Sequence, residues 1–86
     1  MVVVEFFGIP RARAGRAELG VEAKTVGEAL AAVEAACPDL KGLRRADGCL
    51  APQYLLSLAG REFVTEPGQP LRPGDRLLLL SADAGG

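Results

Sequence analysis

The apolar residues of the chain concentrate at its two ends, in segments with the composition of β-strands. Residues 2–9 are almost all β-branched or aromatic, and apolar residues occupy both parities of the alternation. Residues 75–81 contain four consecutive leucines. Strands buried on both faces carry this pattern, so we expect the two segments to lie side by side in the middle of a sheet. If they are parallel, a helical crossover must connect them.

A helix is predicted between these strands. Thr25 is followed three residues later by Glu28, the spacing of a capping box in which each side chain accepts a hydrogen bond from a backbone N–H at the helix start. Pro38 ends the helical pattern. Between Thr25 and Pro38, apolar residues recur at spacings of three and four and predict one buried face: Val26, Ala29, Leu30, Val33, Ala36 and Cys37. Cys37 is therefore assigned to the core.

Turn-forming residues divide the rest of the chain into shorter elements. Pro73 and Gly74 suit a type II turn, because proline fixes φ at the second position and glycine accepts a positive φ at the third. The remaining elements are predicted as a hairpin loop at 10–15, a polar strand at 16–23, a turn with a brief helical piece at 40–48, strands at 50–58 and 61–65, and a loop at 66–69.

This order of elements predicts an α+β fold of the ubiquitin-like β-grasp type. One main helix covers one face of a mixed sheet of four to five strands. The 86 residues, 49% of them apolar, suffice for a single core. We assign residues 1–81 to the β-grasp domain and residues 82–86 to a flexible C-terminal Gly-Gly tail, because the tail has neither apolar anchors nor a helix cap.

Composition excludes several classes of function. The net charge is -1 and basic residues alternate with acidic ones, which argues against nucleic acid as a partner. No segment approaches the roughly 20 apolar residues of a membrane span, and no signal peptide is evident, so we expect a cytoplasmic protein that does not bind membranes. Two cysteines without any histidine cannot form a recognisable zinc site or a Cys-His nucleophilic pair. We therefore expect no metal, no bound cofactor and no catalytic side chains.

Several landmarks fall in an order typical of one protein family. They are Phe6-Phe7 at the end of the first strand, Arg11 shortly after, Thr25-Val26-Gly27-Glu28 at the helix start, Pro70-Leu71 before Pro73-Gly74-Asp75, and the terminal Gly85-Gly86. Over nearly its whole length the chain resembles the MoaD and ThiS family of ubiquitin-like sulfur carriers. Its length fits the molybdopterin synthase small subunit (MoaD) branch better than the shorter thiamin type.

The resemblance implies that the working group is the carboxylate of Gly86. A partner enzyme of the ubiquitin-activating type (MoaB-, MoeB- or ThiF-like) would use ATP to adenylate it, and sulfur would then replace AMP to give a thiocarboxylate. Gly85 and Ala84 would provide thin, extended access to the partner's active site. The chain would act as a non-catalytic, sulfur-donating subunit, with the molybdopterin synthase large subunit as a further partner.

The family pattern also implies which side chains bind partners. One helix covers only one sheet face, yet Phe6-Phe7 and the four leucines supply large apolar groups to both. We assign Phe6, Leu77 and Leu79 to the core. The partner-binding face is assigned to Phe7, Leu78 and Leu80, with Arg11 as a polar contact at the rim.

Three departures from the family pattern leave the partner's identity open. Ala59 occupies a turn position where the family often has asparagine, the loop at 66–69 is longer than usual, and Ser81-Ala82-Asp83 replaces an approach to the tail that commonly contains proline. Carriers for thiamin, tRNA thiolation or cysteine synthesis would use the same tail. So would a ubiquitin-like protein modifier, and a plain β-grasp interaction domain is the remaining alternative.

Overall fold

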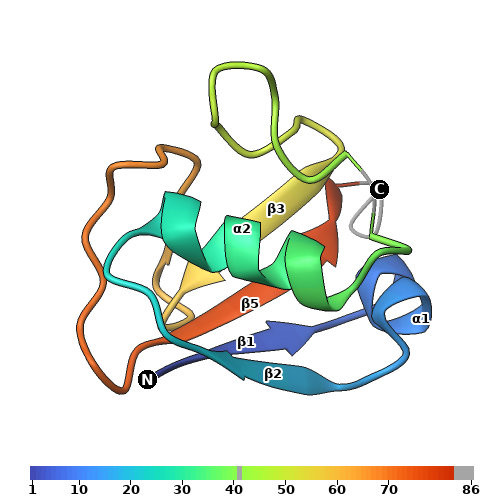
Figure 1. Cartoon of the computed structure of the whole chain (residues 1–86), viewed down its shortest axis with the longest axis horizontal. Helices are drawn as coiled ribbons and strands as arrows, with labels where there is room; N and C mark the ends of the chain where they lie inside the picture. The colour runs from blue at the N-terminus through green and yellow to red at the C-terminus, as the bar shows by residue number, and fades with distance from the viewer. Residues whose placement is uncertain (41, 83–86) are drawn as a thin grey trace.

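A computed structural model describes residues 1–40 and 42–82 of the chain. Along the chain, the elements are β1 (Val2–Phe6), α1 (Ile9–Ala14), β2 (Glu18–Val21), α2 (Val26–Ala36), β3 (Tyr54–Leu58), β4 (Glu62–Phe63) and β5 (Arg76–Ser81). The strands form one mixed sheet in the order β2-β1-β5-β3-β4. Helix α2 lies across one face of this sheet, and α1 lies at one end of it (Figure 1). The predicted β-grasp fold is confirmed.

The central pair of strands is the parallel pair that the apolar ends of the sequence predict. In β1 and β5, Val4 is aligned with Leu77 and Phe6 with Leu79. Strand β3 runs antiparallel to β5 on its other side, with Leu56 aligned with Leu79. Helix α2 lies within the crossover between β1 and β5 and covers the side chains that these strands bury.

Helix α2 begins at the predicted cap. The Thr25 hydroxyl accepts a hydrogen bond from the Glu28 N–H at 3.2 Å. The Glu28 carboxylate accepts one from the Lys24 N–H at 2.8 Å, one residue earlier than a capping box requires. Cys37 caps the other end and is buried, as predicted, whereas Ala36 is exposed and does not belong to the buried stripe.

The predicted hairpin loop at 10–15 is wrong, because this segment forms α1. Gly8, with φ of 67°, turns the chain out of β1. Pro10 then occupies the first turn of the helix, where its missing N–H leaves no hydrogen bond unmade. Gly15 ends the helix in the left-handed conformation, and its N–H bonds to the Arg11 carbonyl.

Most strand boundaries lie inside the predicted ranges. Strand β1 ends at Phe6 instead of residue 9, and β2 covers only the middle of the predicted range 16–23. Pro52 lacks the N–H that a ladder needs, and β3 starts two residues after it, at Tyr54. Residues 42–48 contain turns and one isolated bridge, and the brief helix predicted within 40–48 is not found in its described part.

The turn before β5 has the predicted type II form. Gly74 adopts φ of 90°, and the Asp75 N–H donates to the Arg72 carbonyl at 3.0 Å. The Asp75 carboxylate also accepts a hydrogen bond from the Arg72 N–H at 2.8 Å. This closed turn fixes the point at which β5 enters the sheet.

Candidate functional site

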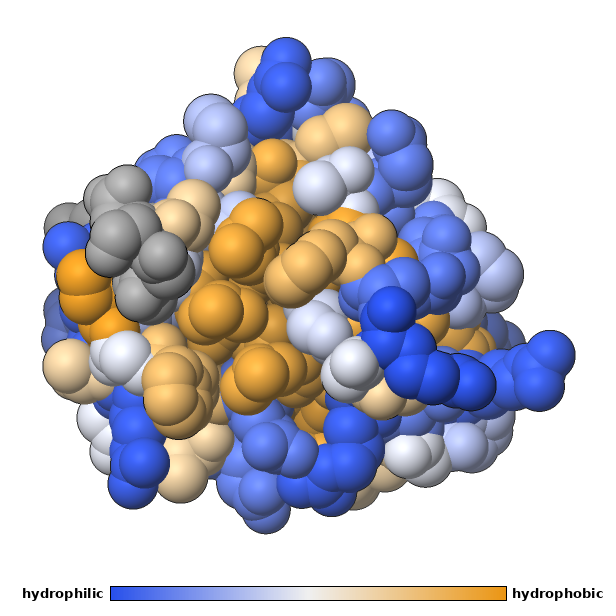
Figure 2. All heavy atoms as spheres, turned by 180° about the vertical axis from the view of Figure 1, so that it is seen from behind, coloured by the Kyte–Doolittle hydropathy of each residue, from blue (hydrophilic) through white to orange (hydrophobic). Residues whose placement is uncertain are grey.

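Among the described residues, the sheet face opposite α2 is apolar and uncovered. Phe6, Leu77 and Leu79 are buried, as predicted, and the intervening residues Leu78 and Leu80 are partly exposed on the other side. Phe7 continues β1 at the same end and is 58% exposed. Figure 2 shows apolar atoms gathered across this face. We call it the open face.

Strands β3 and β4 extend the open face with two residues that sequence reasoning missed. Leu55 is aligned with Leu80, and Phe63 is aligned with Ser57, which in turn pairs with Leu78. Phe63 is 66% exposed. Alternation along residues 54–58 would have found Leu55 had the strand start been known, but the two-residue β4 offers too short a pattern for Phe63.

Charged side chains lie on the open face at the start of β5. The Arg76 guanidinium contacts the Glu5 carboxylate at 2.6 Å and the Glu18 carboxylate at 3.2 Å. The hydrogen bond to Glu5 raises the pKa of Arg76. Glu5 and Glu18 are directly aligned on β1 and β2, so Arg76 offsets the repulsion between like charges on neighbouring strands.

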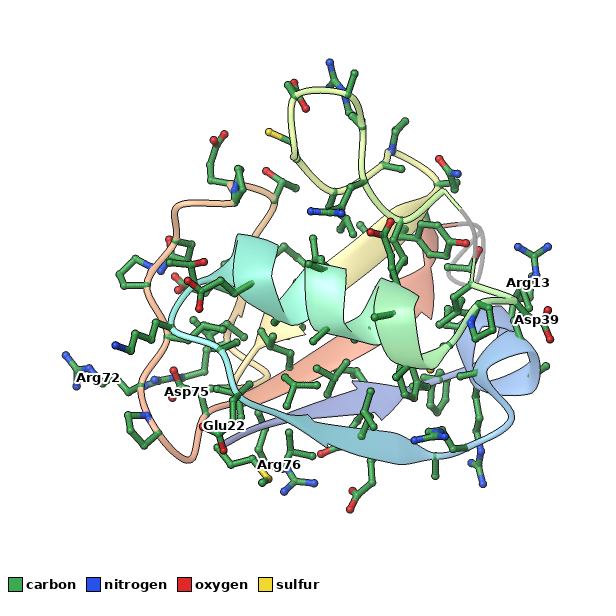
Figure 3. The ribbon with its side chains drawn as sticks, viewed as in Figure 1. Arg13, Glu22, Asp39, Arg72, Asp75 and Arg76 are labelled. Carbon is green, nitrogen blue, oxygen red and sulfur yellow. The ribbon has the colours of Figure 1, made fainter. Side chains whose placement is uncertain are left out.

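Arg11 lies on α1, beside the other end of β5. It is exposed, and with Arg16 it borders a shallow hollow whose other walls include Gly8 and Gly15. Arg13, on the same helix, points away from the body of the molecule (Figure 3). The helix contacts β5. The polar contact predicted for Arg11 at the rim of the open face stays a prediction.

The C-terminal segment leaves the sheet at this same end. Ser81 is buried as the last residue of β5, and the Ala82 N–H donates to the Gln53 carbonyl at 2.8 Å. Ala82 is thereby fixed beside the start of β3. The predicted tail residues Ala84, Gly85 and Gly86 lie outside the described residues.

The two cysteines are separate and free. Cys37 is buried at the C-terminal end of α2, and Cys49 is half-buried in a loop. Desolvation of the Cys49 thiol raises its pKa, and the carboxylates of Asp47 and Glu66 raise it further. A thiol with a raised pKa is a poor nucleophile at neutral pH, so this loop lacks the features of a reactive cysteine site.

In the described part of the chain, no helix is long and apolar enough to cross a membrane.

Comparison with known proteins gives matches to solved structures. No protein-family model and no curated protein matches the chain. The crystal structure of SAMP1 from Haloferax volcanii is 28% identical, with a TM-score of 0.78, and the match covers 99% of this chain and 98% of that one. The solution structure of the small archaeal modifier protein 1 from Methanosarcina acetivorans is 22% identical, with a TM-score of 0.80 and coverages of 99% and 95%.

A third match comes from a complex. A chain of the crystal structure of the Amycolatopsis orientalis BexX/CysO complex is 24% identical, has a TM-score of 0.81, and matches over 100% of both chains. All three matches extend over essentially the whole of both chains, so the similarity concerns the complete β-grasp unit. This chain thus has the ubiquitin-like β-grasp fold and is similar in structure to SAMP1 and CysO.

Proposed function

We propose that this protein is a sulfur carrier that is charged at the carboxylate of Gly86. The observation that carries the proposal is the position of Gly86 in the sequence, four residues after Ala82, whose N–H makes the last hydrogen bond to the sheet in the described part of the chain. The open face ends at the same place. A partner that binds the face therefore meets the start of the segment that carries the reacting group.

The chemistry belongs to the last residue and to the partner enzyme. A carboxylate resists attack until one oxygen becomes part of a good leaving group. Attack of the Gly86 carboxylate on the α-phosphate of ATP forms an acyl adenylate and releases pyrophosphate. Sulfide then forms the acyl C–S bond as the C–O bond to AMP breaks, giving a thiocarboxylate and AMP. A persulfide donor attacks the acyl adenylate in the same way and gives an acyl disulfide. A thiol reductant must then cleave the S–S bond of this acyl disulfide to leave the thiocarboxylate.

The chain's own side chains serve recognition in this scheme. The open face supplies apolar contact area through Phe7, Leu78 and Leu80. Arg11 is proposed as a polar contact at its rim. The BexX/CysO complex supports a partner-bound mode of action, because a β-grasp protein is there found together with a second protein. The enzyme of the ubiquitin-activating type is proposed as the partner here.

Within this function we propose the molybdopterin synthase small subunit as the first role to test. It rests on the resemblance of the sequence to the MoaD branch and on chain length. Affinity purification from the source organism should then recover a molybdopterin synthase large subunit. Recovery of a tRNA-thiolation, thiamin or cysteine-synthesis enzyme instead would assign the carrier to that pathway.

The second candidate function is a ubiquitin-like modifier joined through Gly86 to lysines of target proteins. Similarity to a small archaeal modifier protein favours it, at 28% identity over 99% of the chain. Both functions share the acyl adenylate and differ in the nucleophile that follows. Conjugates of high mass that disappear when Gly86 is deleted would identify the modifier.

Thiocarboxylation in vitro tests the proposal directly. The protein is incubated with its activating enzyme, ATP and sodium sulfide, and intact-protein mass spectrometry should show one oxygen exchanged for sulfur. Fragmentation should place the sulfur on Gly86. Deletion of Gly86, or addition of one residue after it, should abolish the exchange, because the reacting carbonyl is then lost or displaced. A protein that forms isopeptide conjugates but never acquires sulfur would contradict the carrier function.

A further inference from the structure

A hollow lies on the molecule at the end of β5 opposite to the C-terminal segment. It has a volume of about 450 Å³ and lies between the turn at 58–61 and the turn at 72–75. Its walls include Glu5, Ala59, Gly60, Asp75, Arg76 and Leu78. Leu78 also belongs to the open face, so the hollow is continuous with that face.

The walls of the hollow are apolar and backbone surfaces with charged groups among them. Leu77, Leu78 and the side-chain-free Gly60 and Gly74 give it room for the stem of a long side chain. Within the described residues, a Cβ built on Gly60 or on Gly74 would meet no atom within 4 Å. An aliphatic or guanidinium-bearing side chain of a bound protein could therefore enter without displacing the two turns.

The charge of the hollow selects among such side chains. Its lining includes two carboxylates, Glu5 and Asp75, and one guanidinium, Arg76. Both contacts of Arg76 with Glu5 use Oε1, and the hydrogen bond that Asp75 accepts from Arg72 uses Oδ2. In the described part of the structure, Glu5 Oε2 and Asp75 Oδ1 thus retain capacity to accept hydrogen bonds.

Neighbouring charges of both signs lie at this end, since Arg61 and Arg72 line an adjoining hollow together with Asp75. Glu18, the second carboxylate on Arg76, stands at the edge of the hollow and shares the same cation. The Arg72 side chain points away from the body of the molecule (Figure 3). The lining of the hollow therefore carries two carboxylates and one guanidinium, a net charge of -1, and an added cation would be attracted.

We propose that this hollow receives a lysine or arginine side chain from the partner enzyme that takes the C-terminal segment. The proposal rests on the proposed function, because that enzyme must contact the open face while it holds Gly86. The hollow would then hold the end of the interface that lies far from the C-terminal segment, and so set the orientation of the partner along β5. A basic side chain here adds a charge-assisted hydrogen bond to the apolar contacts of the face and discriminates against partners that lack it.

The test compares charge variants in binding to the purified activating enzyme by isothermal titration calorimetry. E5K should weaken binding about tenfold or more, and E5Q by a smaller factor, since each removes the negative charge that faces the incoming cation. R76Q should tighten binding, because it leaves the carboxylates without their internal cation. The matched control is E22K, which makes the same change of charge at an exposed residue after the end of β2.

Circular dichroism of each variant establishes that the changes in binding are measured on folded protein. Rising salt should weaken binding of the wild type more than that of E5Q. Equal losses for E5K and E22K would overturn the proposal, since they would report only overall charge. Wild-type affinity of E5K for the enzyme would overturn it as well. Self-association of the wild type that E5K abolishes would also overturn it, because a second copy of this chain would then occupy the hollow.

Thiocarboxylation of the same variants separates this inference from the proposed function. A wild-type protein that binds the enzyme yet never acquires sulfur would remove the carrier function. Full charging of Gly86 together with unchanged affinity in E5K would remove only the role of the hollow.

Discussion

Ala59 carries the one positive φ outside glycine in the described residues. Its φ is 56° and that of Gly60 is 68°, so the two form the centre of a type I′ turn closed by a hydrogen bond from the Arg61 N–H to the Leu58 carbonyl at 3.1 Å. A left-handed conformation costs an L-residue such as alanine about 1 kcal/mol, whereas asparagine and glycine tolerate it. The turn is therefore under local strain.

We predict that A59N and A59G raise the free energy of unfolding by about 0.5–1 kcal/mol. The Ala59 N–H, which donates to the Arg76 carbonyl at 2.9 Å, is retained in both variants. Urea denaturation measures the change. A46N, at an exposed loop residue, is the control and should change the stability little. Loss of stability in A59N would contradict the strained-turn interpretation.

Cys49 offers a second test at the scale of one residue. Its pKa is raised by desolvation and by the carboxylates of Asp47 and Glu66, so at pH 7–8 less thiolate is present than in an unstructured cysteine. We predict slow alkylation by iodoacetamide that accelerates as the pH rises. D47N should speed it, because it removes one negative charge but keeps an oxygen to accept the Cys49 N–H.

Mass mapping of the alkylated residue identifies which thiol reacts. Cys37 is 3% exposed and should stay unmodified while the protein is folded. Alkylation of Cys49 at the rate of free cysteine, unaffected by D47N, would contradict the predicted pKa shift.

At the scale of elements, the start of α2 depends on close contact with the loop at 66–69. The Gly27 N–H donates to the Pro67 carbonyl at 2.9 Å, and a Cβ on Gly27 would lie 3.0 Å from the Pro67 Cβ and 3.1 Å from its carbonyl oxygen. Alanine favours a helix by up to about 1 kcal/mol over glycine. At Gly27 the close contact with Pro67 opposes this gain in helix propensity. The loop cannot easily move away, because the hydrogen bond from the Gly27 N–H holds the Pro67 carbonyl in place.

We predict that G27A lowers the free energy of unfolding by about 1 kcal/mol despite its better helix propensity. The control is G68A in the same loop, where a Cβ meets no described atom within 4 Å and φ is not positive. G68A should be neutral or slightly stabilising. Thermal unfolding followed by circular dichroism compares the two, and a G27A variant as stable as G68A would show that the loop yields.

The elements that the sequence predicts best are those with long, regular patterns. The stripe of α2 extends over three turns with a cap at Thr25, and β1 and β5 are apolar on both faces, so their type and pairing follow from local physics. Helix α1 escaped prediction because six residues are too few for a periodic signal, and its proline and glycine are equally typical of a loop. Its boundaries depend on the positive φ of Gly8 and on tertiary contact with β5.

The residues of the candidate site could be predicted only where a strand shows a clear alternating pattern. Leu78 and Leu80 follow from alternation along β5, but their neighbours across the sheet depend on register, which brings Leu55 and Phe63 to the same face. The hollow beyond Leu78 joins residues from three separate segments of the chain. Only the folded structure brings Glu5 beside Asp75 and Arg76.

At the scale of the whole molecule, the two faces of the sheet differ in burial, and recognition is proposed for the more exposed one. Leu79 is fully buried beneath α2, whereas its neighbour Leu80 is partly exposed on the open face and is aligned with Leu55 of β3. An aspartate introduced at either position places a charge within β5, but on opposite faces of the sheet. The two substitutions should therefore damage different properties of the protein.

We predict that L80D remains folded, with a loss of stability of about 1 kcal/mol, and no longer binds the activating enzyme. L79D should unfold the domain, because a buried carboxylate without a partner costs several kcal/mol. Circular dichroism and urea denaturation measure folding, and titration calorimetry measures binding of the folded fraction. Thiocarboxylation of Gly86 in L80D should fall with binding, since adenylation requires the enzyme to hold the segment that continues from β5. An L80D variant that is largely unfolded but whose folded fraction keeps wild-type affinity, or one that folds and still binds with wild-type affinity, would remove the open face from the partner interface.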